Sequence, residues 1–161
     1  MYKNFTFLDL DGVILDSEER IVNLKEKNKE LDWNEFFQTL DWFKLLSESK
    51  TINNSVEIIK ELENQKRKIA ILTKIHTLLE MEAKVIELRK NREIQSPIIF
   101  VPPHITKSQI CIPSNNEILI DDSIKNIKDW NLSGGDGILF DPYDKTNAKR
   151  KVKSLEFLLK G

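Results

Sequence analysis

Short, continuous runs of apolar residues recur along the chain and are its clearest pattern. They cover residues 5–8, 69–72, 98–101, 118–120 and 138–140. Each run is short and rich in β-branched or aromatic residues, which is typical of β-strands. Their hydrophobicity is continuous rather than alternating, and this indicates strands that are covered on both faces, as in a parallel sheet.

Stretches with helical spacing of apolar residues separate these strands. One follows Asn54-Ser55, one follows a Thr77-x-x-Glu80 capping box, and one follows Ser123. The second of these predicts a helix whose core face carries positions 78, 81, 85, 86 and 88, and a last helix is predicted around positions 152, 155, 158 and 159. The alternation predicts an α/β fold with a Rossmann-like parallel sheet of about five strands and helices on both faces.

One segment departs from this alternation, because residues 17–53 show helical periodicity without a strand. Asp16-x-x-Glu19 predicts a capped first helix, and an aromatic-rich stretch predicts a second. We therefore expect a small helical cap at 17–53, inserted after the first strand into a core formed by 1–16 and 54–161. Its aromatic residues either pack the cap or, for Phe37 and Trp42, face the site and contact an apolar or planar part of a substrate.

Composition narrows the class of partner. The chain has 161 residues, with 25 Lys and Arg against 26 Asp and Glu, so its formal net charge is −1. This balance argues against nucleic acid and against an anionic membrane as partners. The sequence shows neither an apolar stretch long enough to span a membrane nor the apolar region of a signal peptide, so we expect a cytoplasmic protein. The oligomeric state is left open.

Four carboxylates follow predicted strands. Asp9 and Asp11 come after the first strand, and Asp121 and Asp122 come after the fourth. Because the exits of parallel strands share one edge of the sheet, these like charges converge if the two strands are neighbours. A divalent cation would relieve the repulsion, and a set of oxygen ligands without a His or Cys cluster points to Mg²⁺.

Two further residues fit the same edge by their position. Thr73 ends the second strand, and Lys107 lies in the connection that leads to the fourth. A hydroxyl and an ammonium group complete a phosphate pocket, and the adjacent Lys74 is a further candidate for contact with the phosphate. In such a pocket a carboxylate can attack phosphorus, while an acid two residues later protonates the leaving oxygen. His76 and His104 could each face this pocket, but lone histidines in loops are usually at the surface, where we expect them.

In their order, Asp9-Leu10-Asp11-Gly12-Val13, Thr73, Lys107 and Ile120-Asp121-Asp122 resemble the four motifs of the haloacid dehalogenase (HAD) superfamily. The resemblance implies a HAD-like fold and a Mg²⁺ cofactor. It implies that Asp9 is the nucleophile, that Asp11 is the general acid/base, and that Thr73 and Lys107 bind phosphate. The metal set that it implies is Asp9, Asp11 through its main-chain carbonyl, and Asp122, with Asp121 in support.

In carrying an acid at position 11, the chain resembles the phosphatase and phosphomutase branches of this superfamily. Dehalogenase members lack an acid at this position, and the ion-pumping ATPases have threonine there. The sequences at 119–126 and 138–141 look like the 5'(3')-deoxyribonucleotidase group and its uncharacterised bacterial relatives. The resemblance thus implies a Mg²⁺-dependent phosphomonoester hydrolase for a small metabolite, with a (deoxy)nucleoside monophosphate as a candidate. A sugar-phosphate phosphatase, a phosphomutase and a non-catalytic phosphate-binding module remain alternatives.

Overall fold

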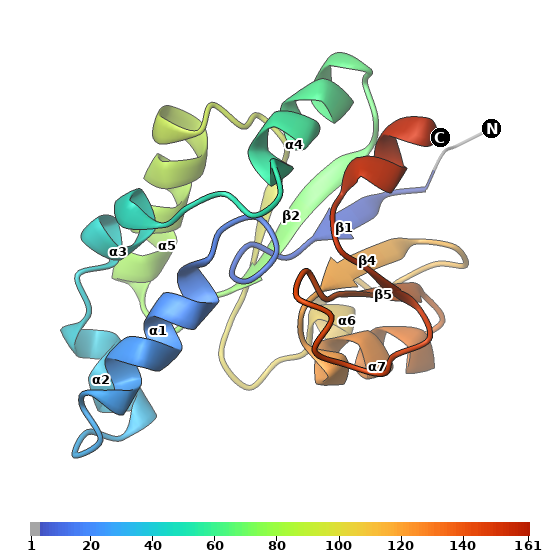
Figure 1. Cartoon of the computed structure of the whole chain (residues 1–161). Coiled ribbons are helices and arrows are strands. Elements are labelled where there is room, and N and C mark those ends of the chain that lie inside the picture. Colours follow the sequence, from blue (N-terminus) through green and yellow to red (C-terminus); the bar gives the residue numbers. More distant parts are fainter. Residues whose placement is uncertain (1–3) are drawn as a thin grey trace.

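A six-stranded parallel sheet organises the chain in a computed structural model, which describes residues 4–161 (Figure 1). The strands are β1 (Thr6–Leu8), β2 (Ile69–Lys74), β3 (Ile98–Val101), β4 (Ile118–Asp121), β5 (Asp136–Phe140) and β6 (Lys151–Val152). Their order is β3-β2-β1-β4-β5-β6, so β1 lies between β2 and β4. The predicted α/β class and parallel sheet are confirmed.

The register of the three central strands sets the position of the acids. Leu8 pairs with Ile71 on one side and with Ile120 on the other. The Asp9 N–H donates to the Ile120 carbonyl at 3.0 Å, which continues the ladder by one residue. Asp9 therefore emerges from the sheet beside Asp121, as expected for neighbouring strands whose carboxyl ends share an edge.

Helices cover both faces of the sheet, as predicted (Figure 1). They are α1 (Ser17–Glu26), α2 (Trp33–Thr39), α3 (Trp42–Glu48), α4 (Ser55–Asn64), α5 (Leu78–Ile86) with a π-helical extension (Glu87–Asn91), α6 (Lys107–Ile110), α7 (Ile124–Leu132) and a 3₁₀-helix (Glu156–Lys160). Side chains of successive strand residues point to opposite faces. The core is accordingly split into two hydrophobic clusters, one on each face.

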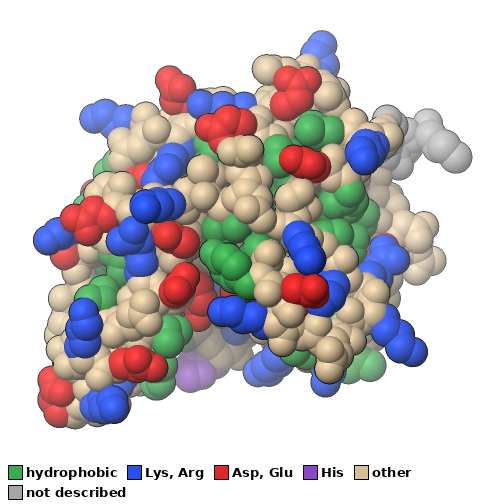
Figure 2. Space-filling model, in the orientation of Figure 1, with side chains coloured by type: hydrophobic (Ala, Val, Ile, Leu, Met, Phe, Trp, Pro, Cys, Tyr) green, Lys and Arg blue, Asp and Glu red, His purple; other side chains and the backbone are tan. Residues whose placement is uncertain are grey.

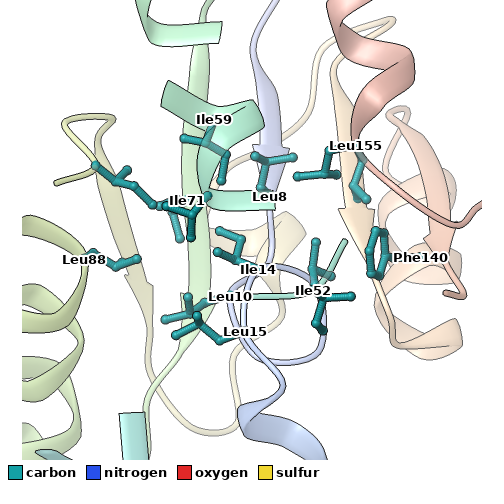
Figure 3. Packing of buried hydrophobic residues seen from close by; sticks show 14 of the residues in the cluster. Leu8, Leu10, Ile14, Leu15, Ile52, Ile59, Ile71, Leu88, Phe140 and Leu155 are labelled. Carbon is teal, nitrogen blue, oxygen red and sulfur yellow. The ribbon is translucent and has the colours of Figure 1, made fainter. Parts of the chain in front are cut away.

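The larger cluster lies between the sheet and the helices that include α4 and the C-terminal 3₁₀-helix. Leu8 of β1 and Ile71 of β2 lie near Ile59 of α4, with Leu155 and Phe140 on the far side of β1 (Figure 3). On the opposite face, a smaller cluster gathers around Phe7 and Trp130, whose rings meet edge to face with centroids 5.3 Å apart.

The inserted segment forms three helices where two were predicted (Figure 1). Leu40 ends α2 in an extended conformation with ψ 135°. The Asp41 side chain then accepts a hydrogen bond from the Lys44 N–H, and this starts α3. Phe36 and Trp42 of this segment belong to the same buried cluster as Leu8. The division into a core and a cap at 17–53 therefore stays a prediction, since the segment shares the main core.

The predicted cap of α1 is wrong in its detail. Asp16 precedes the helix, but its side chain makes no capping hydrogen bond. Its Oδ1 atom instead accepts from the Lys50 N–H at 2.8 Å and from the Arg20 guanidinium at 3.0 Å. A long-range contact to the end of the insert therefore takes the place of the local cap, and it ties the two ends of the inserted segment together.

The predicted core face of α5 is wrong at three of its five positions, while Leu88 is buried in the core as predicted and Met81 is half-buried. Leu78, Val85 and Ile86 are exposed, whereas Glu80 and Lys84 are buried on the side that faces the protein. The reason is pairing, because Lys84 Nζ lies 2.9 Å from Glu80 Oε1 and also contacts residues of the sheet edge. Buried charges of this kind are tolerated when they are paired and hydrogen-bonded.

The last predicted helix begins later than expected and is shorter. Lys151 and Val152 pair in parallel with Leu139 and Phe140 and add a sixth strand to the sheet. Only Glu156–Lys160 is helical, and it is a 3₁₀-helix. Of the predicted apolar stripe, Leu158 still packs in the core, so burial was predicted correctly there although the type of element was not.

The surface carries charges of both signs. On the face shown in Figure 2, acidic and basic side chains are interspersed, so this face has no broad patch of one sign. Within residues 4–161, no helix combines the length and the apolar character that crossing a bilayer requires.

Candidate active site

A tight turn after β1 sets out the first two acids. The Leu10 carbonyl accepts hydrogen bonds from the N–H groups of Val13, Ile14 and Leu15, at 3.3, 3.0 and 3.1 Å. Leu10 itself is fully buried, and so are the three apolar residues that close the turn. The turn is therefore anchored in the core, and this holds Asp9 and Asp11 at the edge of the sheet.

Gly12 makes this turn possible for two reasons. Its φ of +84° lies in the left-handed region that favours glycine. A Cβ atom at this position would also lie only 2.1 Å from Oδ2 of Asp122. The absence of a side chain therefore lets the turn after β1 approach the carboxylate that follows β4.

Three carboxylates and one ammonium group form the centre of the site. Oxygen atoms of Asp9, Asp121 and Asp122 all lie within 4.8 Å of one another. Lys107, the first residue of α6, is 3% exposed and donates from Nζ to Asp9 Oδ1 at 2.7 Å and to Asp121 Oδ2 at 2.6 Å. Lys107 therefore lies among the acids, and the residue that starts a short helix supplies their counter-charge.

The charges of this cluster are unbalanced. Burial, followed by repulsion from Asp121, raises the pKa of Asp9 to about 7, although Lys107 opposes the change. Burial, followed by repulsion from Asp9 and Asp121, raises the pKa of Asp122 to about 9. The pKa of Lys107 is itself raised, because attraction to Asp9 and Asp121 outweighs the effect of burial. One ammonium group thus faces three carboxylates, and the remaining negative charge favours a cation.

The donor set fits a hard divalent cation. Carboxylate oxygens are the ligands that Mg²⁺ prefers, and Mg²⁺ usually takes only one or two carboxylates, with water and substrate oxygens completing its shell. Asp122 is partly exposed and borders the cavity described below, so it is accessible to such an ion. Asp121 is fully buried, and Lys107, the Ser123 N–H and the Asn126 amide all donate to it.

Asp11 occupies a separate part of the site. Its Oδ1 atom accepts from the Ser17 hydroxyl at 2.6 Å, and its Oδ2 atom accepts from Lys84 Nζ at 2.8 Å. Burial alone would raise the pKa of Asp11, but the charge and hydrogen bond of Lys84, aided by Ser17, bring it below its ordinary value. The Asp11 carboxyl is not part of the three-acid cluster, which is compatible with a role in proton transfer.

The acids open into a cavity of about 560 Å³. Asp9, Asp11, Asp122 and Lys107 lie at its base, and Lys74 and Lys125 add positive charge to its wall. Thr73, predicted as a phosphate contact, is fully buried, and its hydroxyl accepts from Lys84 Nζ at 3.0 Å. Lys74 lies beside the site as predicted, whereas Thr73 is one layer behind the surface of the cavity.

An aromatic wall closes one side of this cavity. Phe37 and Trp33 line it together with His76, and the rings of Phe37 and His76 stack with centroids 3.7 Å apart. The prediction that Trp42 faces the substrate is wrong. Trp42 is 1% exposed, and its indole N–H donates to the Phe37 carbonyl at 3.1 Å, so it supports Phe37 from within the core.

The sequence interpretation missed Lys84, Glu80 and His76. His76 was expected at the surface, but its Nδ1 lies 3.1 Å from Glu80 Oε2 and its ring lines the cavity. The only available signal was the spacing of Glu80 and Lys84, which allows an i,i+4 ion pair. Such pairs are usually solvent-exposed. The apolar residues on the other side of α5 also indicated that the opposite face of the helix would be buried.

Fold and site together define the class. The strand order, the acids after β1 and β4, and the inserted helices after β1 give a Rossmann-like fold that resembles solved structures of HAD hydrolases. No protein-family model and no curated protein sequence matches the chain. The chain does resemble solved structures, whose sequences are 10% to 15% identical to it. At this level of identity the resemblance concerns the fold.

Three solved structures illustrate the likeness. YfnB from Bacillus subtilis, described as a HAD hydrolase bound to magnesium, is 14% identical with a TM-score of 0.63, over 98% of this chain and 97% of that one. A D,D-heptose 1,7-bisphosphate phosphatase from B. bronchiseptica, complexed with magnesium and phosphate, is 12% identical with a TM-score of 0.63, over 98% and 99%. A HAD hydrolase of family IA, variant 3, from Entamoeba histolytica is 14% identical with a TM-score of 0.62, over 95% and 92%. These structures do not favour the nucleotidase branch.

Proposed function

We propose that this protein is a Mg²⁺-dependent phosphomonoester hydrolase that acts through an aspartyl-phosphate on Asp9. The observation that carries the proposal is the bridge of Lys107 between Asp9 and Asp121 within the three-acid cluster, at the base of an open cavity. This arrangement supplies a nucleophile, a fixed cation and a place for a metal ion at one point. The solved HAD-fold phosphatase with bound magnesium and phosphate lends support through its fold.

In the first half-reaction, a carboxylate oxygen of Asp9 attacks phosphorus while the bond to the leaving oxygen breaks. Lys107 already occupies Oδ1 of Asp9, so we assign the attack to Oδ2. Asp11 takes up a proton from solvent when the anionic substrate adds negative charge beside it, and it gives that proton to the leaving oxygen. The leaving group departs as an alcohol, and Asp9 carries the phosphoryl group.

In the second half-reaction, water attacks the phosphorus of the aspartyl-phosphate, and Asp11 accepts the proton of that water. The bond between phosphorus and Asp9 breaks, which releases inorganic phosphate and restores the carboxylate. Mg²⁺, held by Asp9, Asp122 and the main-chain carbonyl of Asp11, would neutralise charge on the phosphoryl oxygens. Lys107 holds Asp9 in place throughout and offsets its repulsion from the anionic substrate.

The test is release of inorganic phosphate from nitrophenyl phosphate and glycerol phosphate, with Mg²⁺ and after chelation by EDTA. We expect turnover that requires Mg²⁺. A protein that binds phosphate but releases none from any monoester would instead support the non-catalytic alternative. A panel of nucleoside monophosphates, sugar phosphates and sugar bisphosphates then separates the substrate classes, and transfer of phosphate between two sugar positions would indicate a phosphomutase.

We expect Asp122→Ala to weaken Mg²⁺ activation more than Asp121→Ala does. Asp122 borders the cavity, whereas all donors around Asp121 come from the protein. The measurement is the Mg²⁺ concentration for half-maximal activity, which should rise by about tenfold or more for Asp122→Ala. Asp121→Ala should mainly lower thermal stability, because it leaves Lys107 with one partner. The reverse order would mean that Asp121 is the direct ligand.

The aromatic wall favours a substrate with a planar leaving group, such as a nucleoside monophosphate, over a sugar phosphate. Stacking on a ring contributes about 1–3 kcal/mol per base. We expect Phe37→Ala to raise KM for deoxynucleoside monophosphates about tenfold or more and to leave KM for glycerol phosphate nearly unchanged. Phe43→Ala, a change at an exposed ring of the same insert, is the matched control. Equal losses on both substrates would make Phe37 structural.

A further inference from the structure

Lys84 is a buried lysine that the four motifs do not include. It lies on α5, its side chain is 0% exposed, and it reaches the edge of the sheet beneath the cavity. Its Nζ lies 2.8 Å from Asp11 Oδ2, 3.0 Å from Thr73 Oγ1, 2.7 Å from the Lys74 carbonyl and 2.9 Å from Glu80 Oε1. One ammonium group thus links the turn after β1 with the end of β2.

The hydrogen-bond capacity of Lys84 rules out a direct role in substrate binding. An ammonium group has three protons and no acceptor. Four acceptors already surround Nζ, so no proton is left for a phosphoryl oxygen. Any effect of Lys84 on the reaction must therefore pass through the residues that it holds.

One of these residues, Asp11, acts in the proposed reaction, and another, Thr73, lies behind the surface of the cavity. Asp11 is held from both sides, by Lys84 at Oδ2 and by the Ser17 hydroxyl at Oδ1, so the plane of its carboxyl group is set. At Thr73, Lys84 donates to the hydroxyl oxygen, and the hydroxyl proton keeps only a long contact of 3.4 Å to the Lys74 carbonyl. The Thr73 hydroxyl group is therefore held mainly by Lys84.

Lys84 is itself held in position. Glu80, one helical turn earlier, is 1% exposed and pairs with Nζ through Oε1. Its other oxygen, Oε2, accepts from the His76 N–H at 2.6 Å and lies 3.1 Å from His76 Nδ1. Since α5 also packs on α3 of the inserted segment, the helix that carries Lys84 is supported from two sides.

We propose that Lys84, fixed by Glu80, is a positioning residue that orients the carboxyl group of Asp11 for proton transfer and fixes the hydroxyl group of Thr73 behind the cavity. This inference rests on the proposed function for its kinetic consequence and on the contacts of Lys84 for its structural one. A residue that positions the general acid matters most when the leaving group needs a proton. The signature is therefore a loss of activity that depends on the leaving group.

The first experiment compares Lys84→Met with the wild type on glycerol phosphate, a poor leaving group, and nitrophenyl phosphate, a good one. We expect kcat/KM to fall about 10²-fold on glycerol phosphate and less than about fivefold on nitrophenyl phosphate, the same pattern as for Asp11→Asn. Equal losses on both substrates would overturn the inference, because a purely structural role does not distinguish leaving groups.

Two further variants guard against loss of folding. Lys84→Met leaves Glu80 and Asp11 without their buried partner, so Glu80→Gln/Lys84→Met removes one of the two stranded charges and should show the same leaving-group dependence. Glu87→Gln is the matched control, because Glu87 is 3% exposed on the continuation of the same helix and pairs with Arg92 at 2.8 Å. It should lower stability and should leave the ratio of the two substrates unchanged.

A crystal structure of the double variant tests the inference independently of turnover. We expect the Asp11 carboxyl group and the Thr73 hydroxyl group to have left the orientations described above. If both keep them, Lys84 does not position them, and the inference is overturned whether or not the wild type hydrolyses phosphate esters. Absence of wild-type turnover, with both groups displaced in the variant, would overturn the proposed function and leave the positioning role standing.

Discussion

Asp9→Asn is expected to lower kcat on every phosphomonoester by on the order of 10⁵–10⁶-fold, the scale seen when a covalent nucleophile is removed. The amide has nearly the shape of the carboxyl group but cannot attack phosphorus. The fold should persist, since the change removes one of three mutually repelling acids and leaves Lys107 paired with Asp121. Phosphate release and a thermal melt, measured on the same preparation, give both readouts.

The control for Asp9→Asn is Asp136→Asn. Asp136 begins β5 and pairs with Arg150 at the surface, away from the cavity. It should keep wild-type activity. Wild-type turnover in Asp9→Asn would exclude the aspartyl-phosphate and leave water as the direct attacking group. A loss of activity accompanied by unfolding would instead show that Asp9 is needed for the structure of the site.

Lys107→Met is expected to have the second-largest effect, because it changes both stability and activity. Removing one partner of a buried ion pair costs about 3–5 kcal/mol, since the remaining charge stays buried without compensation. Here two carboxylates, Asp9 and Asp121, lose their shared ammonium group. Activity should fall by about 10²–10³-fold, the scale for loss of one electrostatic donor in an active site.

Urea unfolding with and without Mg²⁺ measures the first part of this prediction. Mg²⁺ should raise the unfolding free energy of Lys107→Met more than that of the wild type, because the cation replaces part of the lost positive charge. Lys60→Met is the control, since Lys60 pairs with an exposed Glu93. Such surface pairs contribute about 0–1 kcal/mol. Equal changes in unfolding free energy for both variants would mean that the Lys107 bridge stabilises the protein no more than a surface ion pair does.

The strands and the acids could be predicted because their signals are local. Continuous apolar runs mark buried parallel strands wherever they occur, and five of the six strands lie at the predicted runs. Asp9 and Asp121 had to meet once their strands were neighbours in a parallel sheet. The place of Lys107 was also predicted, although its spacing alone did not show that it bridges both acids.

The helix faces could not be predicted in the same way. Leu78, Val85 and Ile86 outweigh Glu80 and Lys84 in any local measure of hydrophobicity, yet the charged side of α5 is the buried one. The partners that make this burial possible, Asp11 and Thr73, are distant in the sequence. A pattern within one helix carries no information about acceptors supplied by two other elements.

The aromatic residues of the insert show the same limit. The sequence places Phe37 and Trp42 in one helical segment, and either could face the site. Extended backbone at Leu40 separates α2 from α3, and Phe37 at the end of α2 lines the cavity whereas Trp42 at the start of α3 is covered. Which ring is exposed therefore depends on the angle between two helices.

By itself, the sequence of this protein determined the class of fold and the edge of the sheet that carries the acids. These follow from periodicity and charge, which act over a few residues. Only the tertiary structure decided that Lys84 is buried against Asp11, that Phe37 rather than Trp42 lines the cavity and that a sixth strand is added at the edge of the sheet. Each of these depends on a partner far away along the chain, and burial of a charge or a ring becomes favourable only when that partner is in place.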